Sequence, residues 1–219
     1  DDSTDQSCRL IDKKVHEWKS KGINIKALRR QDRIGFKAGA LNFGLKQTKA
    51  ELIAIFDADF LPRKDFFKKC VPYFEDSKVA LVQSRWEHLN KSFSILTWLQ
   101  AFMLDAHFSI EQKGRNKAGF YINFNGTGGV WRRQSILDAG NWSSDTLTED
   151  LDLSYRAQLK GWKFIYKEDL GSPAELPPVI SAVKTQQYRW NKGAAETARK
   201  HLLKIWKTDI SLIHKIHSS

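Results

Sequence analysis

The feature that most constrains the fold is a short apolar segment, Glu51–Phe56 (ELIAIF), that leads directly into Asp57–Asp59 (DAD). A continuous apolar run of this length is typical of a strand buried on both faces of a sheet. Helical spacing precedes it at Lys37–Gln47 and follows it at Lys64–Glu75, and a second apolar strand is expected at Val79–Gln83. This alternation with short connections predicts an α/β fold with a mostly parallel, doubly wound central sheet.

The rest of the chain continues the mixture of helices and strands without an internal repeat or a low-complexity linker. At roughly 100–200 residues per domain, we expect one domain over residues 1–219. Further predicted elements are helices at 7–21, 95–110, 148–160 and from the Pro177–Pro178 pair to about 203, strands at 23–28 and 163–167, and loops at 113–117 and 123–129.

The composition is that of a basic globular protein. The formal net charge of +11 suits nucleic acid, an anionic membrane surface or a phosphate-bearing substrate. Cys8 and Cys70 are too few for a disulfide scaffold and have no Cys or His at zinc-ligand spacing, which indicates a reducing compartment. The longest apolar stretch, Ile95–Leu104, is far shorter than the ~20 residues that span a bilayer.

Asp57 and Asp59 are the first candidate site residues. Side chains two residues apart in an extended segment point the same way, and α/β sheets bind ligands beyond the carboxyl ends of their strands. Two carboxylates there suit Mg²⁺ or Mn²⁺ bridging a diphosphate. A plain strand-ending turn is an equally open interpretation, whereas an Asp-x-Asp phosphatase is disfavoured by Leu61, where such enzymes usually carry Thr or Val.

Two acidic groups precede predicted helices. Asp1–Asp5 (DDSTD) precedes the first helix, and Asp150 follows Thr148 and Glu149 at the start of a later one. Acidic residues at these positions are often only helix caps, stabilised by the helix dipole. The functional interpretation of Asp150 is a general base, which needs a carboxylate within hydrogen-bond reach of a hydroxyl.

Gln186, Arg189 and Trp190 lie three and four residues apart, so a helix places them on one face. A guanidinium offers a planar fork for phosphate oxygens, and an indole offers a flat surface for a sugar ring. Taken singly, each residue is ordinary.

Six motifs in order along the chain are more specific than any one residue. They are DDSTD (1–5), KAGALN (37–42), DAD (57–59), FNGTGG (124–129), TED (148–150) and QQYRW (186–190). Together they resemble the motifs of the processive family 2 glycosyltransferases, which include cellulose synthases and the cellulose-synthase-like makers of mannan and xyloglucan backbones. LVQSRW (81–86) and FNGTGG are closer to the mannan and xyloglucan branch and its bacterial relatives. Cellulose synthases usually carry Cys where Asn125 stands, so cellulose is the less expected product.

The resemblance implies a GT-A-like (Rossmann-like) fold that binds a UDP- or GDP-sugar donor and a glycan acceptor, with Asp59 as ligand of Mg²⁺ or Mn²⁺ and Asp150 as catalytic base. The residues that it assigns to the donor are Asp1, Lys37, Asp57, Gln186 and Arg189. Those that it assigns to the acceptor are Asn125, Gly126, Thr127, Glu149 and Trp190.

The activity implied is an inverting hexosyl transfer from a nucleoside-diphosphate sugar to a growing β-linked polysaccharide. The resemblance also implies that the chain is a piece of a larger integral membrane protein, with its catalytic domain on the cytosolic face. We expect residues 95–110 and 206–217 to form amphipathic helices at the membrane interface, since both combine large apolar side chains with polar ones. The alternatives are a transferase that adds one sugar, a basic nucleic-acid-binding module and a non-catalytic interaction domain. No nucleic-acid-binding motif is present, so nucleic acid is not expected as a partner.

Overall fold

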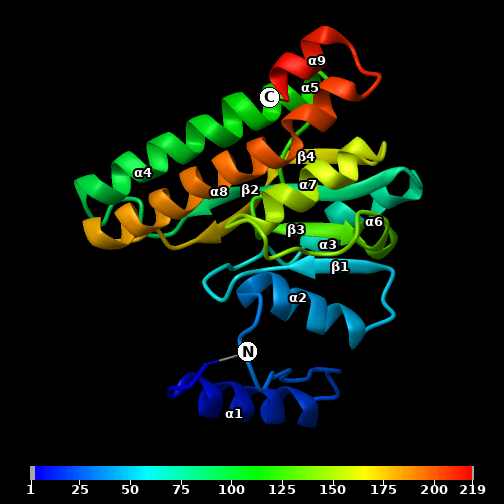
Figure 1. The fold of residues 1–219 in the computed structure, drawn as a ribbon. Coiled ribbons are helices and arrows are strands. Elements are labelled where there is room, and N and C mark those ends of the chain that lie inside the picture. Colours follow the sequence, from blue (N-terminus) through cyan, green and yellow to red (C-terminus); the bar gives the residue numbers. More distant parts are fainter. Residues whose placement is uncertain (1–2, 219) are drawn as a thin grey trace. The chain divides into compact units, whose positions relative to one another are not determined.

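The structure is a computed structural model that describes residues 3–218. Contacts within the chain divide it into two units, one ending at Lys49 and one beginning at Ala50. Unit 1 contains helices α1 (Ser7–Ser20) and α2 (Phe36–Lys46), joined by residues without regular structure (Figure 1). The predicted strand at 23–28 is therefore wrong. Alternation of apolar and polar residues is not enough for a strand, which needs a paired neighbour, and the described part of unit 1 contains none.

Unit 2 is built on a four-stranded sheet with strand order β1-β3-β2-β4. Its strands are β1 (Leu52–Ile55), β2 (Val79–His88), β3 (Gly129–Arg132) and β4 (Lys163–Ala174). β2 and β4 pair in parallel, whereas β3 pairs antiparallel with both β1 and β2. It follows that β1, β2 and β4 share one direction and β3 runs against them.

The sheet was expected to be mostly parallel. Three of its four strands do run in one direction, but among the neighbouring pairs only β2 and β4 are parallel. β3 begins at the last glycine of FNGTGG, where the sequence predicted a loop over 123–129 and no element for residues 130–132. Gly126 and Gly128 adopt φ values of +80° and +69°, a backbone conformation that glycine adopts without steric cost. These two residues reverse the chain so that β3 enters between β1 and β2.

The helices of unit 2 largely follow the predicted pattern. Residues 113–117, predicted as a loop, are instead helical, because the helix that starts at Ile95 continues through a π-helical turn to Lys117. The elements are α3 (Phe66–Cys70), the 3₁₀ turn η1 (Val71–Glu75), α4 (Ile95–Ala106), the π turn η2 (His107–Gln112), α5 (Lys113–Lys117), α6 (Arg133–Asp138), α7 (Glu149–Leu159), α8 (Ile180–Lys207) and α9 (Leu212–His217).

Both faces of the sheet are covered. On one face, Val82, Val130 and Leu170 pack with Phe66 and Cys70 of α3. On the other, Trp131 lies edge-on to Phe124 and Phe164, with ring centroids 5.5 and 5.2 Å apart. Neighbouring residues of β3 thus point into opposite halves of the core, as period-two geometry requires. Within residues 3–218, no helix is both long enough and apolar enough to cross a lipid bilayer.

Candidate functional site

The end of β1 and the FNGTGG loop lie against each other. The Asp57 backbone N–H donates to Thr127 Oγ1 at 2.8 Å, and the Gly128 N–H donates to the Ile55 carbonyl at 2.9 Å. The Phe60 N–H donates to the Asp57 carbonyl at 3.1 Å, which closes a turn around the DAD motif. Asp57 is half-buried and Asp59 is exposed. The fold therefore brings two sequence-predicted groups, the aspartates and the acceptor loop, to one edge of the sheet.

Gln83 and Ser84, at the centre of β2, hold the FNGTGG loop through hydrogen bonds. The fully buried Gln83 donates through Nε2 to the carbonyls of Thr127 at 3.1 Å and Gly128 at 3.2 Å, while its Oε1 accepts from the Asn125 N–H at 3.2 Å. Ser84 Oγ lies 2.5 Å from the Gly128 carbonyl. Both residues belong to LVQSRW, and no function was predicted for them from the sequence. A polar pair inside an otherwise apolar strand was the signal that could have identified them, because buried polar groups need partners.

Gly128 meets a steric requirement as well as a conformational one. A Cβ atom at this position would lie 3.0 Å from Ser84 Oγ and 3.5 Å from Trp86 Nε1. These contacts are tight enough that a side chain would push the loop away from β2. The glycines of FNGTGG thus allow the backbone, and not a side chain, to lie against the strand.

Trp86 connects the loop to α8. Its Nε1 lies 3.4 Å from the Thr127 carbonyl, and its ring is 5.4 Å from Phe60, 5.3 Å from Phe108 and 6.5 Å from Trp190. Trp190 is half-buried at the edge of this aromatic cluster. The predicted sugar-stacking residue therefore lies close to the predicted acceptor loop. On the same face of α8, Gln186 is half-buried and Arg189 is exposed.

Asp150 is the second residue of α7, and it is half-buried. Glu149, Asp150 and Asp152 all lie in the first turn of the helix, where the helix dipole favours negative charge. Ser154 Oγ donates to the Asp150 carbonyl at 2.7 Å and accepts from the Phe124 N–H at 2.9 Å. One hydroxyl thus joins the helix that carries the candidate base to the residue that begins the FNGTGG motif.

α7 lies beside α8 (Figure 1), and the segment before Asp150 is also held by α8. A Cβ atom at Gly193 would lie 2.6 Å from Thr148 Oγ1 and 2.9 Å from the Thr148 backbone nitrogen, so this position accepts only glycine without movement. Thr148 Oγ1 lies 3.3 Å from Thr197 Oγ1, and the Leu147 N–H donates to Glu196 Oε2 at 2.9 Å. The helix that carries QQYRW therefore also positions the TED motif.

A buried charge network joins α7 and α8 one turn further on. Asp152 is fully buried, and its carboxylate lies 2.7 Å from His201 Nε2, 2.8 Å from Lys200 Nζ and 2.8 Å from Arg156 Nη2. Burial alone would raise the pKa of Asp152. The hydrogen bonds from His201 and Lys200 and the charge of Arg156 outweigh that effect and lower the pKa well below its usual range. The carboxylate is therefore ionised at neutral pH and ties the two helices together.

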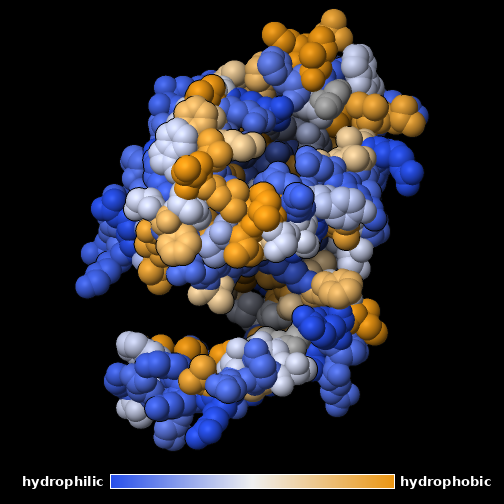
Figure 2. Space-filling view, turned by 90° about the vertical axis from the view of Figure 1, so that its left-hand side faces the viewer, coloured by the Kyte–Doolittle hydropathy of each residue, from blue (hydrophilic) through white to orange (hydrophobic). Residues whose placement is uncertain are grey.

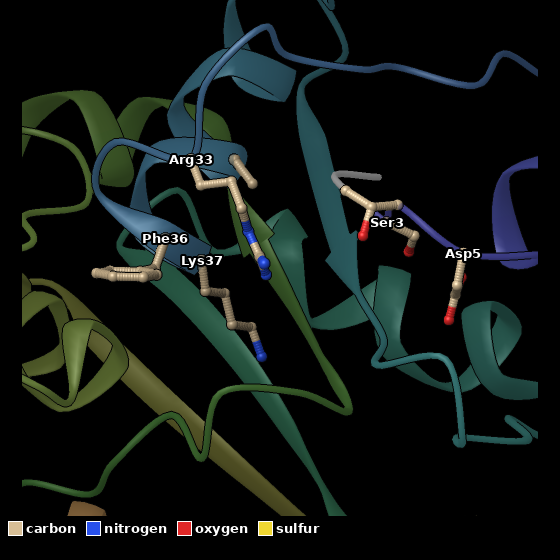
Figure 3. A pocket seen from close by; sticks show the side chains of 7 residues that line it. Ser3, Asp5, Arg33, Phe36 and Lys37 are labelled. Atoms are coloured by element: carbon tan, nitrogen blue, oxygen red, sulfur yellow. The ribbon is translucent and has the colours of Figure 1, made fainter.

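Unit 1 contains a polar pocket of about 450 Å³ (Figure 3). Arg33 and Lys37 extend into the same space from the start of α2 and the turn before it, and Ser3 and Asp5 lie across from them. The Ser7 N–H donates to Asp5 Oδ1 at 2.9 Å and lowers the pKa of that carboxyl, so Asp5 satisfies the first backbone N–H of α1. Asp1, the predicted nucleotide ligand, lies outside the described residues.

The glycine of KAGALN is required by packing within unit 1. A Cβ atom at Gly39 would clash with the Ile34 carbonyl and would lie 2.5 Å from Arg30 Nη1. Arg30 itself donates to the Ile34 carbonyl at 2.8 Å and to the Phe36 carbonyl at 3.1 Å. These bonds shape the turn that leads into Lys37.

The donor set at the end of β1 fits a metal that is shared with a ligand. Within residues 3–218, no group of three or more His, Cys, Asp or Glu side chains is arranged to hold a metal ion. Mg²⁺ in nucleotide sites is commonly held by one or two carboxylates, and substrate phosphates and water complete its shell. Asp57 and Asp59 provide two such carboxylates, so they suit a site completed by a diphosphate and do not suit an all-protein metal site.

Comparisons with known proteins identify the family of the chain and structures of similar fold. The family described as "Glycosyltransferase like family 2" matches the chain over residues 3–193. The chain is 44% identical over 223 residues to "Probable glucomannan 4-beta-mannosyltransferase 11" of Oryza sativa subsp. japonica, a match that covers 99% of this chain and 39% of that protein. It is 42% identical over 210 residues to "Glucomannan 4-beta-mannosyltransferase 2" of Arabidopsis thaliana, a match that covers 94% of this chain and 39% of that protein. The chain thus spans about two fifths of the length of these relatives.

Two solved structures resemble the fold. A mannosyltransferase from Pyrobaculum calidifontis in complex with GDP-Man and Mn²⁺ matches with a TM-score of 0.72 at 18% identity, covering 99% of this chain and 56% of that one. S. aureus TarS 1–349 in complex with UDP matches with a TM-score of 0.61 at 16% identity, covering 97% and 56%. Together with the sheet and helices described above, these matches confirm the predicted α/β fold of GT-A type.

Proposed function

The chain belongs to the glycosyltransferase 2-like family, and on this basis we propose that it is the catalytic domain of an inverting hexosyltransferase that extends a β-linked mannan-type polysaccharide. The observation that carries the proposal is the packing of FNGTGG against the DAD turn, with TED and QQYRW held on the adjoining helices α7 and α8. The names of the two relatives reported above, both glucomannan 4-beta-mannosyltransferases, support a mannosyl donor.

The proposed reaction is one in-line displacement. Asp150 takes the proton from the acceptor hydroxyl as the oxygen attacks the anomeric carbon from the face opposite the leaving nucleoside diphosphate. An α-linked donor sugar then becomes a β-linkage, and no covalent intermediate is needed. Gln186 and Arg189 bind the diphosphate, where a guanidinium stabilises the negative charge that develops on the leaving group.

A divalent cation would further neutralise that charge. Asp59 would be its carboxylate ligand, with Mg²⁺ and Mn²⁺ as the ions that oxygen ligands favour. Asp57 would contact the donor nucleotide. Lys37, which lines the polar pocket of unit 1, and Asp1 are proposed as donor ligands from their motifs alone.

The acceptor would lie along the FNGTGG loop. Asn125, Gly126 and Thr127 line it, Glu149 precedes the base, and Trp190 stacks on a sugar ring. Stacking of an aromatic ring on a sugar suits a chain that must slide forward after each addition, because it holds a flat surface without a directional bond.

We also propose that the domain works on the cytosolic face of a membrane, as part of a longer membrane protein. α4 exposes Ile95 (80%), Phe102 (62%) and Met103 (65%), and α9 exposes Leu212 (64%) and Ile216 (60%). Figure 2, which views the end of unit 2 where α4 and α8 begin, shows hydrophobic side chains gathered among polar ones. Apolar side chains bordered by cations suit the interface of an anionic bilayer. Lys215 is part of α9, and Lys204 and Lys207 lie in the last turn of α8, which precedes it in the chain.

The proposal is tested with the full-length protein in membranes, supplied with GDP-mannose or UDP-glucose and a β-linked manno-oligosaccharide. We expect an insoluble or long product from GDP-mannose that an endo-β-mannanase degrades. Asp150→Asn should lower transfer by about 10²–10⁴-fold, the usual contribution of a general base, while the donor still binds. Addition of one sugar only would favour the single-sugar transferase, and transfer within a few-fold of wild type in Asp150→Asn would remove that residue from the mechanism.

A further inference from the structure

The π-helical turn η2 places two polar side chains, Gln112 and His107, beside Asn125. Gln112 Nε2 lies 2.7 Å from Asn125 Oδ1, and His107 Nε2 lies 3.1 Å from Asn125 Nδ2. On the other side of the same imidazole, His107 Nδ1 lies 2.8 Å from Glu111 Oε2. A π turn bonds residue i to residue i+5, which puts His107 and Gln112 above one another on the face toward the FNGTGG loop.

These contacts determine the direction of every hydrogen bond. Gln112 Nε2 also lies 3.0 Å from the Asn123 carbonyl, and a carbonyl can only accept, so this atom is the amide nitrogen and donates to Asn125 Oδ1. The other end of the Asn125 side chain is then its NH₂ group, which donates to His107 Nε2.

The imidazole is thereby restricted to one tautomer. Because His107 Nε2 accepts, its proton is on Nδ1, and Nδ1–H donates to the carboxylate of Glu111. The hydrogen bond from His107 lowers the pKa of Glu111, which keeps that carboxylate ionised. Arg115, with Nε 3.4 Å from Glu111 Oε1, supports the same charge state.

The hydrogen-bonded chain Gln112–Asn125–His107–Glu111 is called the relay below. It leaves part of the Asn125 amide for a ligand. One N–H is used by His107, and one lone pair of Oδ1 is used by Gln112. An amide carries a second N–H and a second lone pair. The backbone N–H of Asn125 donates to Gln83 Oε1, which fixes the backbone that carries this side chain. Exchange of the two ends of the amide would set its NH₂ against Gln112 Nε2 and its oxygen against His107 Nε2, so both bonds would be lost.

We propose that His107 is a positioning residue that holds the Asn125 amide in one orientation, so that it presents one donor and one acceptor to the hydroxyl groups of the acceptor sugar. The inference rests on the proposed function, in which Asn125 contacts the acceptor. Reversal of the amide would exchange the donor and acceptor, and a sugar with hydroxyls matched to one arrangement would be mismatched with the other.

The first test needs no substrate. ¹⁵N NMR of the full-length protein, with the imidazole signals assigned by loss in His107→Phe, should show His107 protonated on Nδ1 alone at neutral pH. In Asn125→Asp, a carboxylate oxygen replaces the NH₂ group, so His107 should become doubly protonated. A proton on Nε2 in the wild type, or no change in Asn125→Asp, would overturn the relay.

The second test is kinetic. His107→Phe keeps a ring but removes the acceptor, and we expect about a 2- to 10-fold increase in the acceptor KM, the usual effect of one lost neutral hydrogen bond. The donor KM and the rate of donor hydrolysis should stay unchanged. His107→Gln, which can still accept through its amide oxygen, should recover most of the acceptor affinity, and His214→Phe on α9 is the matched control.

The two tests separate the inference from the proposed function. If wild-type protein transfers no sugar to any acceptor while NMR shows the expected tautomer, the proposed function fails and the relay stands. If transfer occurs and His107→Phe changes donor and acceptor KM equally or neither, the positioning function of His107 is wrong.

Discussion

Asp152→Asn is expected to loosen α7 from α8 and thereby to disable the candidate base. The variant keeps the size and shape of the side chain but removes its charge. His201, Lys200 and Arg156 would then face an uncharged group that can accept hydrogen bonds through one oxygen only. Because Asp152 lies two residues after Asp150 on the same helix, movement of α7 moves the base.

The magnitude follows from the burial of the network. Removal of one member of a buried ion pair costs about 3–5 kcal/mol, because the partner charges stay behind without compensation. Asp152 is fully buried, but Lys200 and Arg156 keep 26% and 17% of their side-chain area exposed and can reach water. We therefore expect Asp152→Asn to cost the lower end of this range, about 3 kcal/mol of stability.

Hydrogen exchange on the full-length protein measures this effect locally. A loss of about 3 kcal/mol in opening free energy corresponds to roughly 100-fold faster exchange of the α7 amides. Asp145→Asn is the matched control, because Asp145 binds the same Lys200 but is 56% exposed. An exposed pair contributes at most about 1 kcal/mol, so exchange in α7 should change little in that variant.

The effect also has a predictable pH dependence. The pKa of Asp152 is lowered in the folded state, so its contribution to stability is complete above the unfolded value of about 3.8 and is lost as the pH falls through the lower folded value. The opening free energy of α7 should therefore differ by the full amount between wild type and Asp152→Asn at pH 7, and the difference should disappear in strong acid. Equal exchange of α7 in both proteins at pH 7 would refute the reasoning.

Four further predictions follow from the site. Asp59→Ala should weaken donor binding in the presence of Mg²⁺ and make it insensitive to chelator; equal wild-type affinity with and without metal in calorimetry would show that the metal assignment is wrong. Trp190→Ala should impair chain elongation more than donor hydrolysis, by about the 0.5–1.5 kcal/mol of an aromatic contact beyond burial, and an equal loss of both would indicate collapse of α8. Gly193→Ala should displace Thr148 and lower kcat, whereas Gly114→Ala, where a Cβ meets nothing within 4 Å, should not. The domain should pellet with anionic liposomes at low salt and be released as salt rises, and a supernatant location at every salt concentration would refute α4 and α9 as interface helices.

The sequence by itself determined those features that depend on a few neighbouring residues. The apolar run of ELIAIF predicted β1, and the aspartates after it were correctly expected at the edge of the sheet. Helical spacing identified α1 and α4, because a period near 3.6 can be seen in any window of three turns. The order of six motifs was enough to indicate the family, since spacing and residue type along the chain carry that signal without any knowledge of contacts.

Only the tertiary structure decided which distant groups meet. The insertion of β3 between β1 and β2, and the failure of residues 23–28 to form a strand, depend on which neighbour is available for pairing. The positions of Gln83 against the FNGTGG loop and of His107 beside Asn125 depend on hydrogen bonds across 42 and 18 residues. A local pattern predicts a helix or a strand because its energy lies in the backbone and in nearby side chains. A buried amide or imidazole takes its function from a partner that only the complete fold brings within 3 Å or so.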